Sequence, residues 1–174
     1  MKKLIGVLAC LLMLGVLFAG CAEKDESGGA SKNVEGELAD LVEKIYENLD
    51  DSVQLPGIMN TELTAEGTQF NPNIKYFIGS DEIKFTEGLV SEAAIGAQAY
   101  SLVLLRMDGD FNIDEVREKV KTGTVDGEHF LYNKWICASV DPGDVIVDSI
   151  GDLLVIIVSD DSAEIHEAFK KLAE

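Results

Sequence analysis

Cys21 is the residue of this 174-residue chain whose surroundings most clearly predict chemistry. It follows an apolar run of about 15 residues at positions 4–18, which is too short for an ordinary membrane span of roughly 20. Two small residues, Ala19 and Gly20, separate that run from the thiol. This lipobox arrangement is what a lipoprotein signal peptidase requires. We therefore expect residues 1–20 to be a cleaved signal peptide and Cys21 to carry a diacylglycerol.

The other features of the N-terminal segment agree with secretion. Lys2 and Lys3 give the positive start, and residues 1–20 contain no acid. Phe18 departs mildly from the leucine that usually occupies its place in a lipobox. Two alternatives stay open, an uncleaved anchor helix and a plain secretory signal. On the leading interpretation the mature protein is extracytoplasmic and lipid-anchored on the outer face of the cytoplasmic membrane.

Few other side chains have the type and spacing of nucleophiles, bases or metal ligands. Cys10 lies in the signal segment and Cys137 lies in an apolar stretch, so we expect no internal disulfide and a buried, inert thiol. The two histidines, His129 and His166, lack metal-ligand spacing. No catalytic, phosphate-binding or dinucleotide-binding motif occurs. The sequence therefore predicts no metal, no cofactor and no enzymatic activity.

Acidic residues are abundant, 32 in all, and two patterns among them resemble sites. Positions 108–114 alternate oxygen side chains as a calcium loop does, but Ile113 and Lys119 stand where an EF-hand needs glycine and glutamate. A turn and a helix cap are the favoured interpretation. Acid pairs such as Asp50-Asp51 would serve a hydrolase only if burial raised the pKa of one carboxyl group. A hydrolase of peptidoglycan or peptides remains the alternative function.

A cluster of aromatic residues is the best local candidate for a binding surface. The cluster follows a Gly-Thr-Val-Asp-Gly loop and fits no regular periodicity. Loops carry binding residues more often than scaffold elements do, although packing into the core is the favoured alternative. The candidate residues are His129, Phe130, Tyr132 and Trp135.

The net charge limits the classes of partner. The chain carries −18, and loss of the two lysines in the signal peptide leaves −20 on the mature protein. Such a protein is repelled by nucleic acid and by anionic lipid heads, so we expect no nucleic-acid partner. The membrane bond must then come from the diacylglycerol on Cys21. The remaining partner is expected to be an unknown envelope protein or a small ligand.

Composition divides the mature chain into two parts. Residues 21–35 hold the lipidated cysteine and a polar, Gly/Ser-rich tether without a core pattern. About 14 such residues have an r.m.s. reach of roughly 20 Å. Residues 36–174 have the length of one globular domain with its own core.

Hydrophobic periodicity predicts an α+β domain with a mostly antiparallel sheet of about four strands from two hairpins and three main helices packed on it. The helices are expected from Leu38, from a cap at Asn112 to Gly123, and from a cap at Asp161. The expected strands are 83–94, 99–108, 145–149 and 153–159. Leu153 to Val158 is wholly apolar, so this strand should be covered on both faces.

Several stretches carry a resemblance to a known family. They are the opening helix at 41–46, Lys134-Trp-Ile-Cys137, the segment 140–159 and the closing amphipathic helix. With them, the chain from about Leu38 to Leu172 resembles a family of small Gram-positive lipoproteins described only as a domain of unknown function. The resemblance implies a lipid-anchored envelope protein and brings no activity with it. We therefore expect a non-enzymatic binding or accessory module at the cell envelope.

Overall fold

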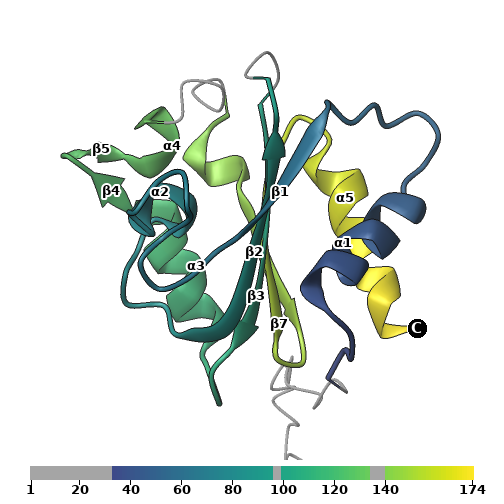
Figure 1. The fold of residues 1–174 in the computed structure, drawn as a ribbon, viewed down its shortest axis with the longest axis horizontal. Coiled ribbons are helices and arrows are strands. Elements are labelled where there is room, and N and C mark those ends of the chain that lie inside the picture. Colours follow the sequence, from purple (N-terminus) through teal and green to yellow (C-terminus); the bar gives the residue numbers. More distant parts are fainter. Residues whose placement is uncertain (1–32, 96–98, 134–139) are drawn as a thin grey trace, which may run out of the picture.

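The computed structural model describes residues 33–95, 99–133 and 140–174. Cys21, Trp135 and Cys137, with the expected signal peptide, lie outside the described residues. A five-stranded sheet separates two helical layers in the described domain (Figure 1). The α+β class and the mostly antiparallel sheet are therefore as predicted. No helix in these described ranges is long and apolar enough to cross a membrane.

Every pair of neighbouring strands in the sheet is antiparallel, in the order β1-β2-β3-β7-β6. The two predicted hairpins, β2–β3 and β6–β7, are confirmed, and they meet where β3 pairs with β7. The strand bounds are β1 (Ile58–Glu62), β2 (Phe85–Ala93), β3 (Tyr100–Met107), β6 (Ile146–Ile150) and β7 (Leu153–Ser159). A separate small hairpin joins β4 (Thr124–Val125) to β5 (Glu128–His129).

The predicted number of about four strands was too low because it omitted β1. This strand reads Ile-Met-Asn-Thr-Glu, and Thr61 is its only buried residue. A strand at the border of a sheet needs little apolar surface, so β1 carries no alternating hydrophobic pattern.

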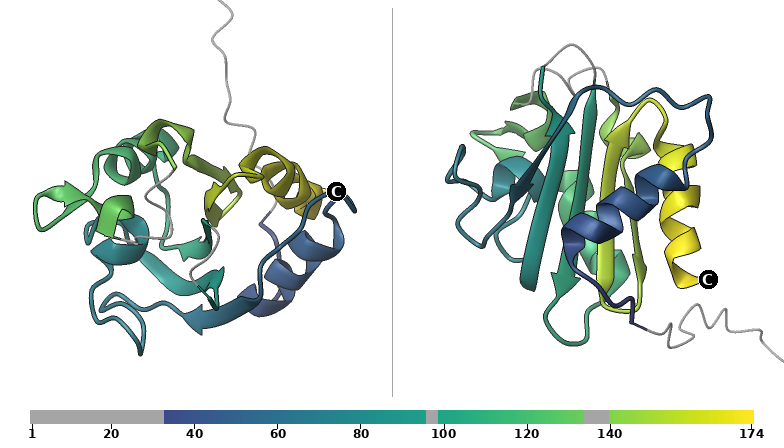
Figure 2. Two further views of the ribbon diagram at one scale, coloured as in Figure 1. Left: turned by 90° about the horizontal axis from the view of Figure 1, so that it is seen from above. Right: turned by 45° about the vertical axis from the view of Figure 1, so that its right-hand side comes forward.

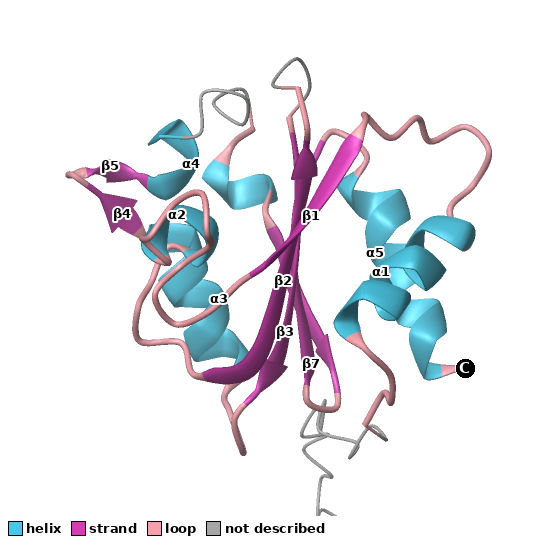
Figure 3. Ribbon diagram, in the orientation of Figure 1, coloured by secondary structure: helices cyan, strands magenta, loops and turns pink. Residues whose placement is uncertain are grey.

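The helices lie on both faces of the sheet (Figures 2 and 3). The predicted three main helices are α1, α3 and α5, and the short helices α2 and α4 add to the α3 layer. One face holds α1 (Leu38–Glu47) and α5 (Ser162–Lys170). The other holds α2 (Lys75–Ile78), α3 (Ile113–Thr122) and α4 (Phe130–Asn133). Two short 3₁₀ turns, η1 (Pro142–Asp144) and η2 (Lys171–Ala173), complete the described elements.

The central strands supply both cores because successive side chains point to opposite faces. Leu104 and Val155 pack under α1 and α5, whereas Leu105 and Ile156 pack under α3. All residues from Leu153 to Val158 are buried, which confirms the prediction of a strand covered on both faces.

The two predicted helix caps differ in outcome. The Asn112 side chain accepts hydrogen bonds from the backbone N–H groups of Asp114 and Glu115, as expected. Asp161 occupies the cap position of α5, but its side chain makes no capping bond. A capping residue requires an extended backbone, and the Asp161 backbone (φ −100°, ψ 30°) is not extended. Instead, the Ser162 hydroxyl accepts from Ser159 N–H at 3.0 Å and donates to the Ser159 carbonyl at 2.6 Å.

The folded domain begins before the predicted boundary at residue 36. Val34 is buried and packs with the core beneath α1. The Arg106 guanidinium donates to the carbonyl oxygens of Val34 and Gly36, each at 2.9 Å. The end of the expected tether is therefore part of the domain.

Candidate functional site

The aromatic stretch predicted as a binding surface does not form a continuous aromatic surface in the described residues. Phe130 is 1% exposed and belongs to the core, as the favoured alternative expected, so it is not part of a binding surface. The β4–β5 hairpin turns the chain so that Phe130 begins α4 against Gly79 at the end of α2. Tyr132 is 49% exposed, and the fourth residue, Trp135, lies outside the described residues.

His129 is engaged by the backbone. Its Nδ1 atom accepts from the Leu131 N–H at 3.3 Å, so Nε2 carries the proton that reaches the Lys121 carbonyl at 3.1 Å. The imidazole thus caps the last turn of α3 and packs on the ring of Phe130 at a centroid distance of 4.9 Å. In this arrangement both ring nitrogens already have partners.

In the calcium-like segment at 108–114, two of the oxygen-bearing side chains already have partners within the protein. Asn112 caps α3, and the Asp114 carboxylate pairs with Arg117. Among the described residues, no group of three or more His, Cys, Asp or Glu side chains is arranged to hold a metal ion.

The two outer strands of the sheet differ sharply, and β6 is the protected one. The Val147 carbonyl accepts two hydrogen bonds from the Arg117 guanidinium, both at 3.2 Å. The Asp148 carboxylate accepts from the Ser149 N–H at 2.9 Å through one oxygen and contacts His166 Nε2 at 2.6 Å through the other. Charged side chains thus form hydrogen bonds with outward backbone groups of β6, so these groups are not free to pair with another strand. We call such an edge guarded.

The outer edge of β1 has no such guard in the described structure. The Leu63 N–H donates to the Gly88 carbonyl, and the Ala94 N–H donates to the Gly57 carbonyl. These two hydrogen bonds show which residues of β1 direct their backbone groups toward β2. The unbroken register then directs the backbone groups of alternate residues away from β2. We call this set the β1 edge; its members are Ile58, Asn60 and Glu62.

Two hollows flank the β1 edge. The first, which we call the groove, has a volume of 740 Å³ and lies between the start of α1 and strands β1 and β2. Its lining includes residues 37–39, 60–65 and 85–89. The second hollow, of 360 Å³, lies against the turn that follows β1 and shares Thr61, Glu62 and Thr64 with the groove. The two hollows therefore adjoin at the C-terminal end of β1 and the turn that follows it.

Every charged residue that lines these two hollows is a glutamate. Glu37, Glu62 and Glu66 form no ion pair with a described residue, whereas Glu87 lies 3.6 Å from Arg106 Nε. The groove also has apolar parts, which include buried Leu38 and half-buried Leu89. The arrangement suits a ligand with positive charge and some apolar surface.

A chain of hydrogen bonds connects the groove to the core. The Tyr100 hydroxyl donates to the Tyr46 hydroxyl at 2.8 Å, and Tyr46 lies 2.6 Å from the Ser91 hydroxyl. Ser91 in turn donates to Asn60 Oδ1 at 2.6 Å. Tyr46 belongs to α1, so the chain also fixes this helix to the sheet.

Burial shapes the electrostatics of this chain. Desolvation raises the pKa of Tyr46 above its usual 10.0, although its hydrogen bonds with Ser91 and Tyr100 act in the opposite direction. Desolvation, followed by the proximity of Tyr46, raises the pKa of Tyr100 still more strongly. Both hydroxyl groups are therefore protonated at neutral pH, and each has a single proton to donate.

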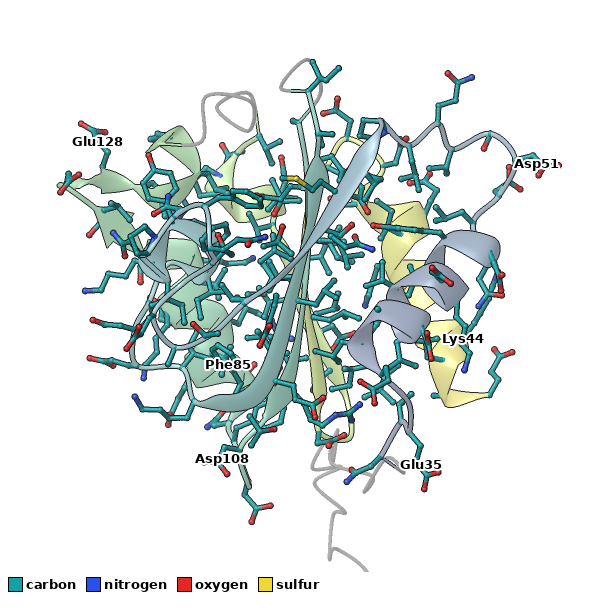
Figure 4. The ribbon with its side chains drawn as sticks, viewed as in Figure 1. Glu35, Lys44, Asp51, Phe85, Asp108 and Glu128 are labelled. Atoms are coloured by element: carbon teal, nitrogen blue, oxygen red, sulfur yellow. The ribbon has the colours of Figure 1, made fainter. Side chains whose placement is uncertain are left out.

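A further hollow of 530 Å³ lies between the lead into α1 and the C-terminus. It mixes cations and anions, among them Lys44 and Glu35, which Figure 4 labels near α1 and near the start of the described chain. Lys171, also in its lining, already donates to the Asn48 carbonyl at 2.9 Å. This mixture favours no class of ligand.

The burial of carboxyl groups bears on the hydrolytic alternative. No Asp or Glu is buried among the residues that the structure describes. The hydrolytic alternative, which needs a carboxyl group with a pKa raised by burial, therefore has no candidate in the described ranges.

Comparisons of the chain with protein-family models, with curated proteins and with solved structures find no match.

Sequence reasoning missed the β1 edge and the groove. The groove combines three segments that are far apart in the sequence, and none of them carries a recognisable motif. The only local signal is the polar strand Asn60-Thr61-Glu62, which reads as a loop until its pairing with β2 is known.

Proposed function

We propose that this protein is an extracytoplasmic, lipid-anchored binding module of the cell envelope, and that the groove beside the β1 edge is its binding site. The anchor is the diacylglycerol expected on Cys21. The observation that carries the binding role is the juxtaposition of a 740 Å³ groove with an unguarded strand edge. Proteins that do not use such an edge usually block it, as this one does at β6.

The acidic surface supports a domain that stands clear of an anionic membrane. Glu35 and Asp108 lie at the same end of the molecule, where the described chain begins (Figure 4). With a net charge of −20 after removal of the signal, this end is repelled by anionic lipid heads. The lipid and the tether then hold the domain near the bilayer without adsorbing it.

The anchor is tested by the mass of the protein extracted from membranes. The wild-type chain should begin at Cys21 and carry the mass of a diacylglycerol. Cys21→Ser should accumulate as an unmodified precursor. An intact wild-type precursor with a free Cys21 thiol would refute the anchor.

The binding site is tested by photo-crosslinking in intact cells. A photoreactive residue replaces Ala65, which lines the groove, or Ala163, another exposed alanine, which lies on α5. The proposal expects a discrete crosslinked product from position 65 and none from position 163. Equal crosslinking at both positions, or none at either, would contradict a binding role for the groove.

A further inference from the structure

We propose that the groove binds an extended, cationic polypeptide segment, which adds to the sheet as a new strand beside β1. This inference rests on the proposed binding function and specifies its ligand. Three features of the described residues support it: the free backbone groups of the β1 edge, the charge of the two hollows and the orientation of the Asn60 amide.

The backbone supplies the first argument. Ile58, Asn60 and Glu62 point their N–H and C=O groups away from β2, in the spacing that an added antiparallel or parallel strand requires. A polypeptide in extended conformation matches this repeat, whereas a compact small molecule satisfies only part of it. Side chains of an added strand alternate between its two faces, and two adjoining hollows at the end of β1 can receive them.

Charge supplies the second argument. Both hollows contain glutamates and no cation, and Glu62 lines both. An added strand with lysine or arginine on its two faces would place positive charge beside Glu37 on one side and Glu66 on the other. Long basic side chains also cover apolar surface with their methylene groups, which suits Leu38 and Leu89.

Asn60 supplies the third argument. The Tyr100 hydroxyl is buried and donates to the Tyr46 hydroxyl, so Tyr46 must direct its own proton to another acceptor. Tyr46 then donates to Ser91, and Ser91 donates to Asn60 Oδ1. The Asn60 Nδ2 group makes no hydrogen bond to a described residue. Asn60 is exposed, so this group is accessible to a carbonyl oxygen of the added strand.

The experiment measures binding of synthetic peptides to the full chain purified in mild detergent. The probe is a short peptide of alternating lysine and threonine. The first control is the same peptide with methyl groups on alternate backbone nitrogens, which keeps the charge and removes strand pairing. The second control replaces every lysine by glutamate. The proposal expects binding of the probe alone, and weaker binding at higher ionic strength.

Two variants of the protein separate the backbone from the charge. Asn60→Pro removes an outward N–H together with the Asn60 amide, without changing charge, at an edge position where proline is tolerated, and it should reduce affinity at least about tenfold. Glu37→Gln, Glu62→Gln and Glu66→Gln together should reduce it by a similar factor. The matched control neutralises Glu43, Glu118 and Glu128, which are exposed outside the two hollows, and should leave affinity nearly unchanged.

Each other outcome overturns the ligand assignment. Equal binding of the methylated peptide excludes strand addition, and equal loss in both triple variants excludes a local charge effect. A dimer that forms without peptide and is lost in Asn60→Pro would assign the β1 edge to a second copy of this chain. If the probe fails to bind while position 65 still crosslinks in cells, the cationic strand is wrong and the binding function stands.

Discussion

Arg106 and Val34, 72 residues apart, are joined by a hydrogen bond of 2.9 Å from the guanidinium Nη1 to the carbonyl oxygen. The same side chain lies 3.3 Å from the Asp152 carboxylate, so its charge is balanced where it is mostly buried. This contact fixes the direction in which the chain enters the domain. It also shows that the folded domain includes Val34, which the sequence analysis assigned to the tether.

A truncated chain of residues 36–174 should therefore be less stable than residues 22–174. It lacks the Val34 side chain and a carbonyl acceptor of Arg106, and burial of a valine contributes about 1.5–3 kcal/mol. We expect a decrease of about 2 kcal/mol in the free energy of unfolding, measured by urea denaturation. Residues 33–174 should match the longer chain. Equal stability of all three would show that Val34 contributes nothing.

Phe130 and Tyr132 provide a matched test of the described aromatic residues. Phe130→Ala removes a buried ring and should cost about 3–5 kcal/mol. Tyr132→Ala removes a half-exposed ring and should change stability by less than about 1 kcal/mol. Thermal melting of both variants decides the matter. A large loss from Tyr132→Ala would mean that its ring packs against the protein in solution.

The stability of the protein should fall in alkaline solution. The folded-state pKa values of Tyr46 and Tyr100 are raised above the usual 10.0, so the native state holds these protons more tightly than the unfolded chain does. Their contribution is complete below pH 10.0 and is lost as the pH rises toward the folded values. Each tyrosine should contribute a slope of about 1.4 kcal/mol per pH unit in that window.

Tyr100→Phe is the control for this pH dependence. It should decrease the alkaline slope by the share of one tyrosine and cost about 1 kcal/mol at neutral pH through the lost hydrogen bond. Urea denaturation at neutral and alkaline pH measures both effects. An unchanged slope in the variant would show that Tyr100 ionises freely in the folded protein.

Arg117→Met should convert β6 into a second unguarded edge. The Val147 carbonyl loses both of its hydrogen bonds from the guanidinium. The outer edge of β6 can then pair with a strand of another molecule. Light scattering across a range of concentrations should show a larger assembly for the variant than for the wild type. An unchanged mass would mean that Asp148 alone protects the strand.

The sequence predicted those features whose signals are local. The apolar run from Leu153 to Val158 indicated a strand buried on both faces, and Asn112 indicated a helix start, because both patterns act over a few residues. β1 was missed because its place in the sheet depends on pairing with β2, which begins 23 residues after β1 ends.

The candidate site depends almost wholly on such distant pairing. Whether a strand is an edge is a property of the topology, and the chain carries no sequence mark at Asn60 that distinguishes it from a loop residue. Phe130 was a candidate for the binding surface, although packing into the core was the favoured alternative. The sequence around it did not decide between the two, and the short β4–β5 hairpin turns that residue into the core.

The guarded state of β6 also limits how these molecules can polymerise. Two copies that paired through β1 would present only β6 at both ends of the joined sheet, and in each copy Arg117 of α3 donates to the Val147 carbonyl of that strand. Such an assembly is closed by two-fold symmetry and cannot grow into a fibre. If the proposed anchor concentrates these molecules on one membrane surface, the guard on β6 would limit their assembly through sheet edges to pairs.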